Sequence, residues 1–81
     1  MEVLIGKITH FYSHINVAVL ELTGQLKVGD AVRIVGHTTE FTQTVESLEI
    51  EHQKVQSAGP GEVALKVWEY VRRGDEVFKL Q

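Results

Sequence analysis

The fold is decided by the stretch LKVGDAVRIVG, residues 26–36. Val32 and Ile34 alternate with the charged Arg33, which is the period-two pattern of a half-buried β-strand. Gly29-Asp30 comes directly before this strand. Glycine there can adopt a positive φ, and the aspartate can accept hydrogen bonds from the amides of the turn. The stretch therefore predicts a tight turn that leads into a strand.

The same turn chemistry recurs later in the chain. Residues 74–77 repeat the form Gly-Asp-x-Val, and residues 61–63 are a looser copy, Gly-Glu-Val. Pro60-Gly61 is also a turn signal, because proline fixes φ and glycine relieves the reversal. We expect a positive-φ glycine and an acidic acceptor just before a strand at each place.

Strand patterns dominate the rest of the chain, and no window predicts a helix longer than one turn, at residues 52–57. Residues 10–14 are expected to be a hairpin loop, and Gly6 marks a bulge or bend in the strand around it. The apolar parity changes between Val45 and Leu48, which predicts a β-bulge near Glu46 or Ser47. The predicted strands are residues 3–9, 16–22, 31–36, 41–50, 63–67 and 76–80.

Length and composition place these strands in one domain, residues 1–81. Hydrophobic residues make up 43% and charged residues 23%, as in ordinary globular proteins. Six short strands separated by glycine turns predict an all-β fold that is closed or nearly closed, because closure removes exposed strand edges. There is no signal peptide and no apolar run long enough to span a membrane, so we expect a cytoplasmic protein without membrane contact.

The order of these segments resembles a known family. The runs at 26–36, 45–50, 58–67 and 71–77 together resemble domain 2 of translational GTPases such as elongation factor Tu. A closer resemblance is to the small C-terminal barrel of the collagenase-like peptidase family, which shares IGKITHF (5–11), GHTTEF (36–41) and VESLEIEH (45–52). Both resemblances imply a six-stranded Greek-key β-barrel of the translation-factor domain 2 type.

Catalytic groups are not visible in the sequence. The chain has no cysteine, which excludes a disulfide or a thiolate zinc site, and its serines lie in no nucleophile motif. His10 and His14 are four residues apart, a spacing that could bind a metal on a helix, but this region is not predicted to be helical. A Gly-x-x-x-x-Gly-Lys-Ser/Thr phosphate loop is also missing. We therefore expect a non-catalytic module without metal, cofactor or bound nucleotide.

One segment combines basic and aromatic side chains: Lys66, Trp68, Tyr70, Arg72 and Arg73. Aromatic faces can stack on bases, and arginine can bind phosphate with two hydrogen bonds, so this segment is a candidate RNA contact. Alternatively, the two rings seal one end of the barrel while the arginines are solvated, with their apolar stems on a ring.

Two further candidates lie elsewhere. The resemblance to elongation factor Tu places Val45-Glu46 at the pocket for the terminal adenosine of aminoacyl-tRNA, and a solvent-facing glutamate beside a bulge is the alternative. Phe11 and Tyr12 are adjacent aromatics in the expected loop. We expect that one of them is exposed for stacking or docking, or that it caps the barrel instead.

Two functions follow from these candidates. The first is a translation-related binding module that contacts tRNA, rRNA or a ribonucleoprotein through residues 66–73. The net charge of −3 is unusual for such a module, since nucleic-acid binders are generally basic. The alternative is a protein-interaction or substrate-presenting accessory domain for a collagenase-like peptidase partner. Residues 40–51 hold four glutamates and no lysine or arginine, which suits a basic protein partner.

Overall fold

The computed structural model describes residues 1–81, and strands are its only regular elements, which confirms the all-β prediction. No helix in it is long and apolar enough to cross a membrane. Ten strands form where the sequence predicts six, and the closed six-stranded Greek-key barrel stays a prediction. The strands are β1 (Glu2–Tyr12), β2 (Val17–Leu22), β3 (Leu26–Lys27), β4 (Ala31–Val35), β5 (Glu40–Thr44), β6 (Leu48–Ile50), β7 (Gln53–Val55), β8 (Ser57–Ala58), β9 (Gly61–Lys66) and β10 (Glu76–Leu80).

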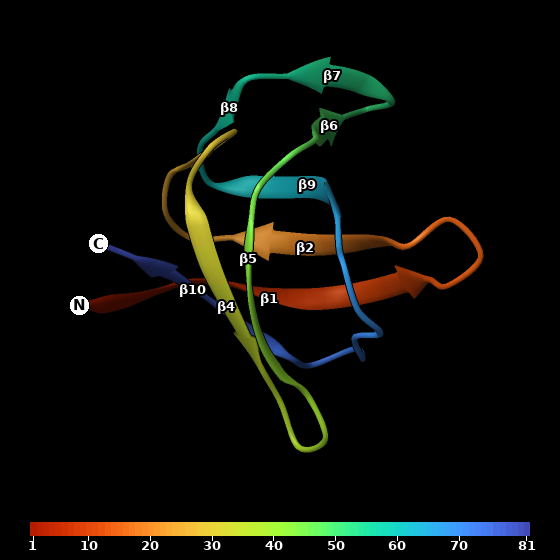
Figure 1. Ribbon diagram of the computed structural model, residues 1–81. Coiled ribbons are helices and arrows are strands. Elements are labelled where there is room, and N and C mark those ends of the chain that lie inside the picture. Colours follow the sequence, from red (N-terminus) through yellow and green to blue (C-terminus); the bar gives the residue numbers. More distant parts are fainter.

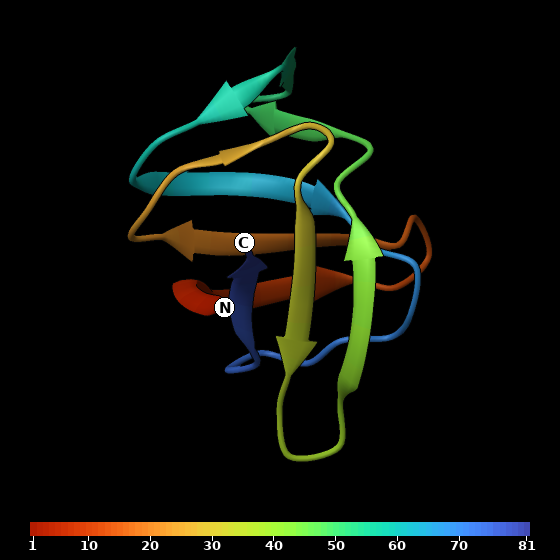
Figure 2. The same cartoon turned by 60° about the vertical axis from the view of Figure 1, so that its left-hand side comes forward.

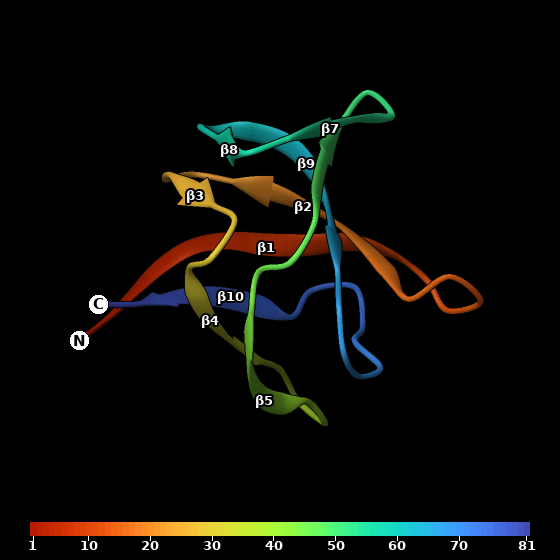
Figure 3. The same ribbon diagram turned by 45° about the horizontal axis from the view of Figure 1, so that its top comes forward.

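Eight strands form one antiparallel sheet in the order β5-β4-β10-β1-β2-β9-β6-β7, and β3 pairs with β8. The sheet folds over on itself, so that β4 and β5 cross β1, β2 and β9 at a steep angle (Figures 1 and 2). The short β3 and β8 lie at the end of the molecule where the β2–β3 connection turns back (Figure 3). The two halves of the folded sheet thus face each other across the core.

The long strand β1 belongs to both halves. Its first part pairs with β10 and its second part with β2, and the register shifts once in each pairing, between Leu4 and Gly6 and between Ile8 and His10. Such irregularities bend a strand and increase its twist. A Cβ atom on Gly6 would lie 2.8 Å from the carbonyl oxygen of Glu21, so glycine allows the close approach of β2. The predicted bend at Gly6 is confirmed.

Sixteen buried apolar residues form the core between the two halves. Val32 and Ile34 of β4 are fully buried while Arg33 points outward, as their alternation predicts. Arg33 forms ion pairs with Glu40 and with Glu2, the latter at 2.9 Å. The guanidinium of Arg33 donates hydrogen bonds to both carboxylates, and these bonds, the one to Glu40 first, raise the pKa of Arg33.

The two Gly-Asp turns are built alike. Gly29 and Gly74 have φ values of 99° and 95°. Asp30 Oδ2 accepts a hydrogen bond from the amide of Lys27 (3.0 Å), and Asp75 Oδ2 accepts one from the amide of Arg72 (2.9 Å). Both turns confirm the predicted pair of a positive-φ glycine and an acidic hydrogen-bond acceptor before a strand.

The looser copy of this turn is confirmed only in part. Gly61 also has a positive φ, of 134°. Glu62, however, is exposed within β9 and lies directly opposite Glu21 of β2. Its side chain faces outward from the sheet instead of back toward a turn.

Residues 41–50 do not form one bulged strand, so the predicted β-bulge at Glu46 or Ser47 is wrong. The chain changes neighbour instead, because β5 pairs with β4 whereas β6 pairs with β9 and β7. Between them, Val45 exchanges backbone hydrogen bonds with the Gly29-Asp30 turn, its amide bonding to Asp30 and its carbonyl to Gly29. Val45 and Leu48 are both buried, so the break between the strands brings both side chains inward.

Two local predictions are also corrected. Residues 52–57 form no helical turn, because a two-residue turn at Glu51-His52 joins β6 to β7. Residues 10–12 are not in a loop, because β1 continues to Tyr12, which pairs with Val17. The loop of this hairpin is residues 13–16.

The chain ends meet at one side of the molecule (Figures 1 and 3). The amino group of Met1 donates a hydrogen bond to the carbonyl of Gln81 (3.0 Å), and the amide of Gln81 donates one to the carbonyl of Met1 (2.8 Å). These bonds extend the antiparallel pairing of β1 and β10 to the last residue.

We expect Gly36→Ala to destabilise the fold by about 1–3 kcal/mol, as overpacking does. The new Cβ would lie 1.8 Å from Oδ1 of Asp75, and that carboxylate is buried and bound to the Arg72 amide. Urea unfolding measures the loss. Gly59→Ala is the matched control, because its Cβ meets only the flexible side chain of Gln25. Equal losses of stability in the two variants would contradict the steric conflict between a Cβ at position 36 and Asp75.

Candidate protein-binding surface

The connection between β9 and β10 presents two large aromatic side chains to solvent. Val67 and Val71 are buried in the core and anchor this connection, and the amide of Val67 donates a hydrogen bond to the carbonyl of Asn16 (2.9 Å). Between the anchors, Trp68 is 52% exposed and Tyr70 is 62% exposed. The two valines therefore close this end of the core, and the alternative in which the rings seal it is wrong.

A buried amide holds this connection against β5. Gln43 is only 2% exposed. Its Nε2 donates hydrogen bonds to the carbonyls of Lys66 (3.0 Å) and Thr44 (3.2 Å), and its Oε1 accepts one from the amide of Trp68 (2.9 Å). The side chain thus bridges two segments that do not pair as strands, and it fixes the backbone from which Trp68 projects.

The indole of Trp68 is held in place by a carboxylate. Its Nε1 donates a hydrogen bond to Oε1 of Glu46 (3.0 Å), which lies in the break between β5 and β6. Because an aromatic ring with few free rotamers loses little entropy on binding, such an ordered indole is suited to a contact surface. Glu46 is therefore exposed but not free, since it orients Trp68.

Tyr70 belongs to a second cluster beside it. Its ring meets that of Phe11 edge to face, with centroids 4.9 Å apart, and the guanidinium of Arg72 lies 5.4 Å from the tyrosine centroid. Nε of Arg72 also donates a hydrogen bond to Oγ1 of Thr38 (2.9 Å). We call the combined surface the aromatic edge; it comprises Phe11, Glu46, Trp68, Tyr70 and Arg72.

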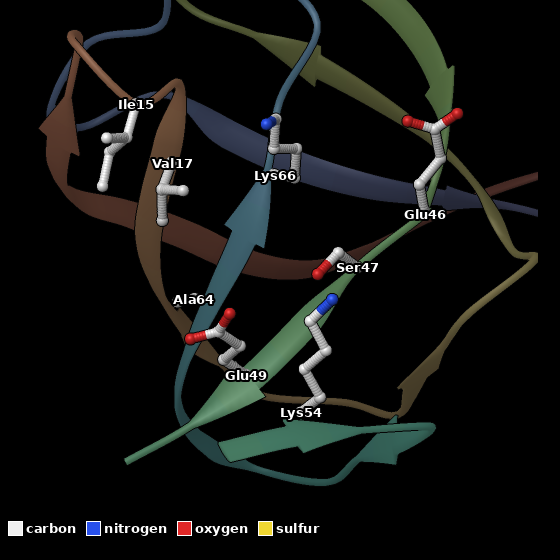
Figure 4. Close-up of a pocket in the computed structure, with 8 residues that line it drawn as sticks. All are labelled: Ile15, Val17, Glu46, Ser47, Glu49, Lys54, Ala64 and Lys66. Carbon is white, nitrogen blue, oxygen red and sulfur yellow. The ribbon is translucent and has the colours of Figure 1, made fainter. Parts of the chain in front are cut away.

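The structure brings some of the predicted residues together and separates others. Arg73 lines a small hollow with Phe11, Tyr70 and Arg72, so the two arginines lie together. Lys66 lies elsewhere, in a hollow on the outer face of the sheet that also holds Glu46 (Figure 4). The segment from Lys66 to Arg73 is therefore not one continuous basic face.

The adjacent aromatics of β1 point in different directions. Phe11 packs against the core, whereas Tyr12 is exposed and its ring lies tilted against that of His10, with centroids 4.3 Å apart. They diverge because successive side chains of a strand alternate between its faces. The expectation of two aromatics on a loop is wrong, and the exposed Tyr12 agrees with the first of the two alternatives, the one in which an aromatic is exposed.

Gln43 was not among the predicted site residues. Its signal was present, because Phe41, Gln43 and Val45 alternate and place the glutamine on the inward side of β5. A polar side chain at an inward position predicts a buried hydrogen-bonding role. In the structure, no three histidine, aspartate or glutamate side chains gather where they could hold a metal ion.

No family model matches the chain. It is 39% identical over 82 residues to an uncharacterised protease of Methanocaldococcus jannaschii, covering 99% of this chain. The chain spans about a fifth, 20%, of that relative's length.

Solved structures share the fold. The C-terminal domain of a Geobacillus thermoleovorans protein described as a U32 peptidase matches with a TM-score of 0.89 and 20% identity, covering 96% of this chain and 92% of that domain. Its selenomethionine variant gives 0.86 and 19%, covering 93% and 96%. The chain therefore has the fold of a peptidase C-terminal domain. The kinship with domain 2 of elongation factor Tu stays a prediction.

We expect Gln43→Leu to destabilise the fold by about 1–3 kcal/mol, because it removes the hydrogen-bond partners of the part-buried Trp68 amide and Lys66 carbonyl. It should also free the single tryptophan of the chain, so that fluorescence anisotropy falls. Thr42→Val, on the outward side of the same strand, is the control and should change both quantities little. Unchanged anisotropy in Gln43→Leu would show that the bridge does not position Trp68.

Proposed function

We propose that this chain is a non-catalytic accessory domain that binds protein for a peptidase-type catalytic partner. The observation that carries the proposal is the extent of the similarity: nearly the whole chain aligns with a fifth of a protease, and it has the fold of a domain at the C-terminus of a peptidase-type protein. A unit of this size beside a larger catalytic part is suited to docking or to presenting a segment of substrate.

The aromatic edge supports a protein partner. Tryptophan, tyrosine and arginine are the residues that most often dominate the binding energy of protein interfaces. Trp68, Tyr70 and Arg72 are exposed, and each is held by a neighbouring side chain, respectively Glu46, Phe11 and Thr38. Because these contacts order the side chains before binding, little further entropy is lost on association.

The test is calorimetric titration of the chain against a purified U32-type peptidase that lacks its own C-terminal domain. We expect Trp68→Ala/Tyr70→Ala to weaken binding by about 2 kcal/mol or more, roughly thirtyfold in Kd. Leu4→Ala is the control, since this exposed leucine lies outside the aromatic edge. The proposal fails if the intact chain does not bind, or if the control weakens binding as much as the double variant.

RNA is the second candidate ligand, and one observation favours it. Arg72 lies over the ring of Tyr70, with Arg73 beside them, which is an arrangement that can stack a base and bind phosphate. The basic surface available to RNA is small, because Lys66 lies apart from the two arginines and Arg33 is paired with two glutamates.

For RNA, the expected result is tRNA binding that weakens linearly with the logarithm of salt concentration. Arg72→Ala/Arg73→Ala should lower the slope by about one for each phosphate contact removed. A filter-binding titration at several salt concentrations measures both. If neither the wild type nor the variant binds at low salt, the RNA candidate is rejected.

A further inference from the structure

We propose that the outer face of the sheet holds a second binding surface, a groove that takes an extended peptide with lysine or arginine next to an apolar residue. This inference rests on the proposed function in one respect, namely that the ligand is protein. Apart from Glu46, which also lines the first hollow, it uses different residues from the aromatic edge, so variants that leave Glu46 in place test the two surfaces separately.

The groove consists of three hollows in a row, of about 430, 370 and 560 Å³. The first and second share Ile15, Val17, Glu49 and Ala64. The second and third share Glu51, His52 and Glu62. We call this continuous surface the outer groove. Three connected hollows form a track, which suits an extended chain better than a compact ligand.

The floor of the outer groove is apolar although it faces solvent. Val17 and Val19 of β2 and Ala64 of β9 point outward from the sheet and are only half-buried. Ile15 and Tyr12 rise beside them from the β1–β2 hairpin, and both are exposed (Ile15 in Figure 4). An apolar side chain of an extended peptide can contact this floor while its neighbours in sequence point away.

Charge complementarity identifies the rest of the ligand. The second and third hollows are lined by Glu49, Glu51 and Glu62, and no lysine or arginine lines them. Glu62 also lies directly opposite Glu21, a cross-strand pair of like charges that destabilises the sheet. Lys7 faces Glu21 on its other side, from β1. A cationic side chain of a ligand would relieve this repulsion, which selects lysine or arginine for this end.

The first hollow differs, because Lys54 and Lys66 line it together with Glu46 and Glu49 (Figure 4). Lys54 is the direct cross-strand neighbour of Glu49. Positive charge of the ligand is therefore favoured only at the end near Glu51 and Glu62, which gives the bound peptide a direction.

The turn at Glu51 and His52 has a backbone conformation that these residue types disfavour. Glu51 and His52 have φ values of 51° and 67°, and they are the two central residues of a hairpin turn that Asn-Gly adopts most easily. A left-handed conformation costs a non-glycine residue free energy. Asn16, in the hairpin that forms the opposite wall, also has a positive φ, of 55°. Stability alone would therefore favour residues other than Glu51 and His52 at this turn.

The first test uses a fluorescein-labelled peptide, Lys-Arg-Thr-Val-Thr-Leu-Gly, and measures fluorescence anisotropy. Glu62→Lys should weaken binding about tenfold or more, because a like charge replaces a complementary one. Glu69→Lys is the control for net charge, since Glu69 lies on the β9–β10 connection, outside the groove. The proposal is overturned if Glu69→Lys weakens binding as strongly, or if Glu-Asp-Thr-Val-Thr-Leu-Gly binds equally well.

A second variant separates binding from folding. Glu51→Asn/His52→Gly should raise the midpoint of thermal unfolding, because it relieves the turn, and should weaken peptide binding. Binding that stays unchanged in this more stable protein would overturn the role of the turn.

Amide chemical shifts should move at Val17, Val19 and Ala64 on adding peptide. Shifts confined to Trp68 and Tyr70, or displacement of the peptide by single-stranded RNA, would overturn the site.

The experiments distinguish failure of the proposed function from failure of the outer groove. Trp68→Ala/Tyr70→Ala should leave peptide binding in the outer groove unchanged while weakening the contact with the peptidase. If the double aromatic variant has no effect on the peptidase but the groove variants weaken the peptide, only the proposed function of the aromatic edge fails.

Discussion

The buried amide of Gln43 is the interaction on which the arrangement of the two halves depends. The sheet runs from β5 at one end to β7 at the other, and β5 does not pair with the strands that it crosses. Gln43 supplies hydrogen bonds where a strand ladder is missing, by joining β5 to the carbonyl of Lys66 and the amide of Trp68. A buried polar group with all its partners specifies one arrangement, whereas an apolar residue would tolerate several.

This bridge connects the core to the surface. The same backbone that Gln43 holds carries Trp68 outward, and Glu46 then orients the indole. The aromatic edge is therefore built from inside to outside, with a buried hydrogen bond, an anchored connection between Val67 and Val71, and finally the exposed rings. The outer groove lies instead on the pleated face of β2 and β9, where its geometry depends on two hairpins.

The parts of the fold set by local chemistry could be predicted. The Gly-Asp turns and the alternation of Val32 and Ile34 depend on neighbouring residues only, and both are present in the structure. The division of residues 41–50 could not be predicted, because it depends on β5 and β6 choosing different neighbours far away in sequence. For the same reason, the sequence showed Lys66 and Arg72 as one patch, although the sheet places them on different surfaces.

The meeting of the two chain ends has a mechanical consequence. Met1 and Gln81 are joined by two hydrogen bonds at the open end of the antiparallel β1–β10 pair. Tension applied between the ends would therefore pull perpendicular to these strands and load their bonds one after another, like a zipper. Strands pulled along their length would share the load among all bonds at once. A domain with this geometry should yield to small forces, starting at its attachment point and proceeding toward Gly6, where the register of the pair shifts.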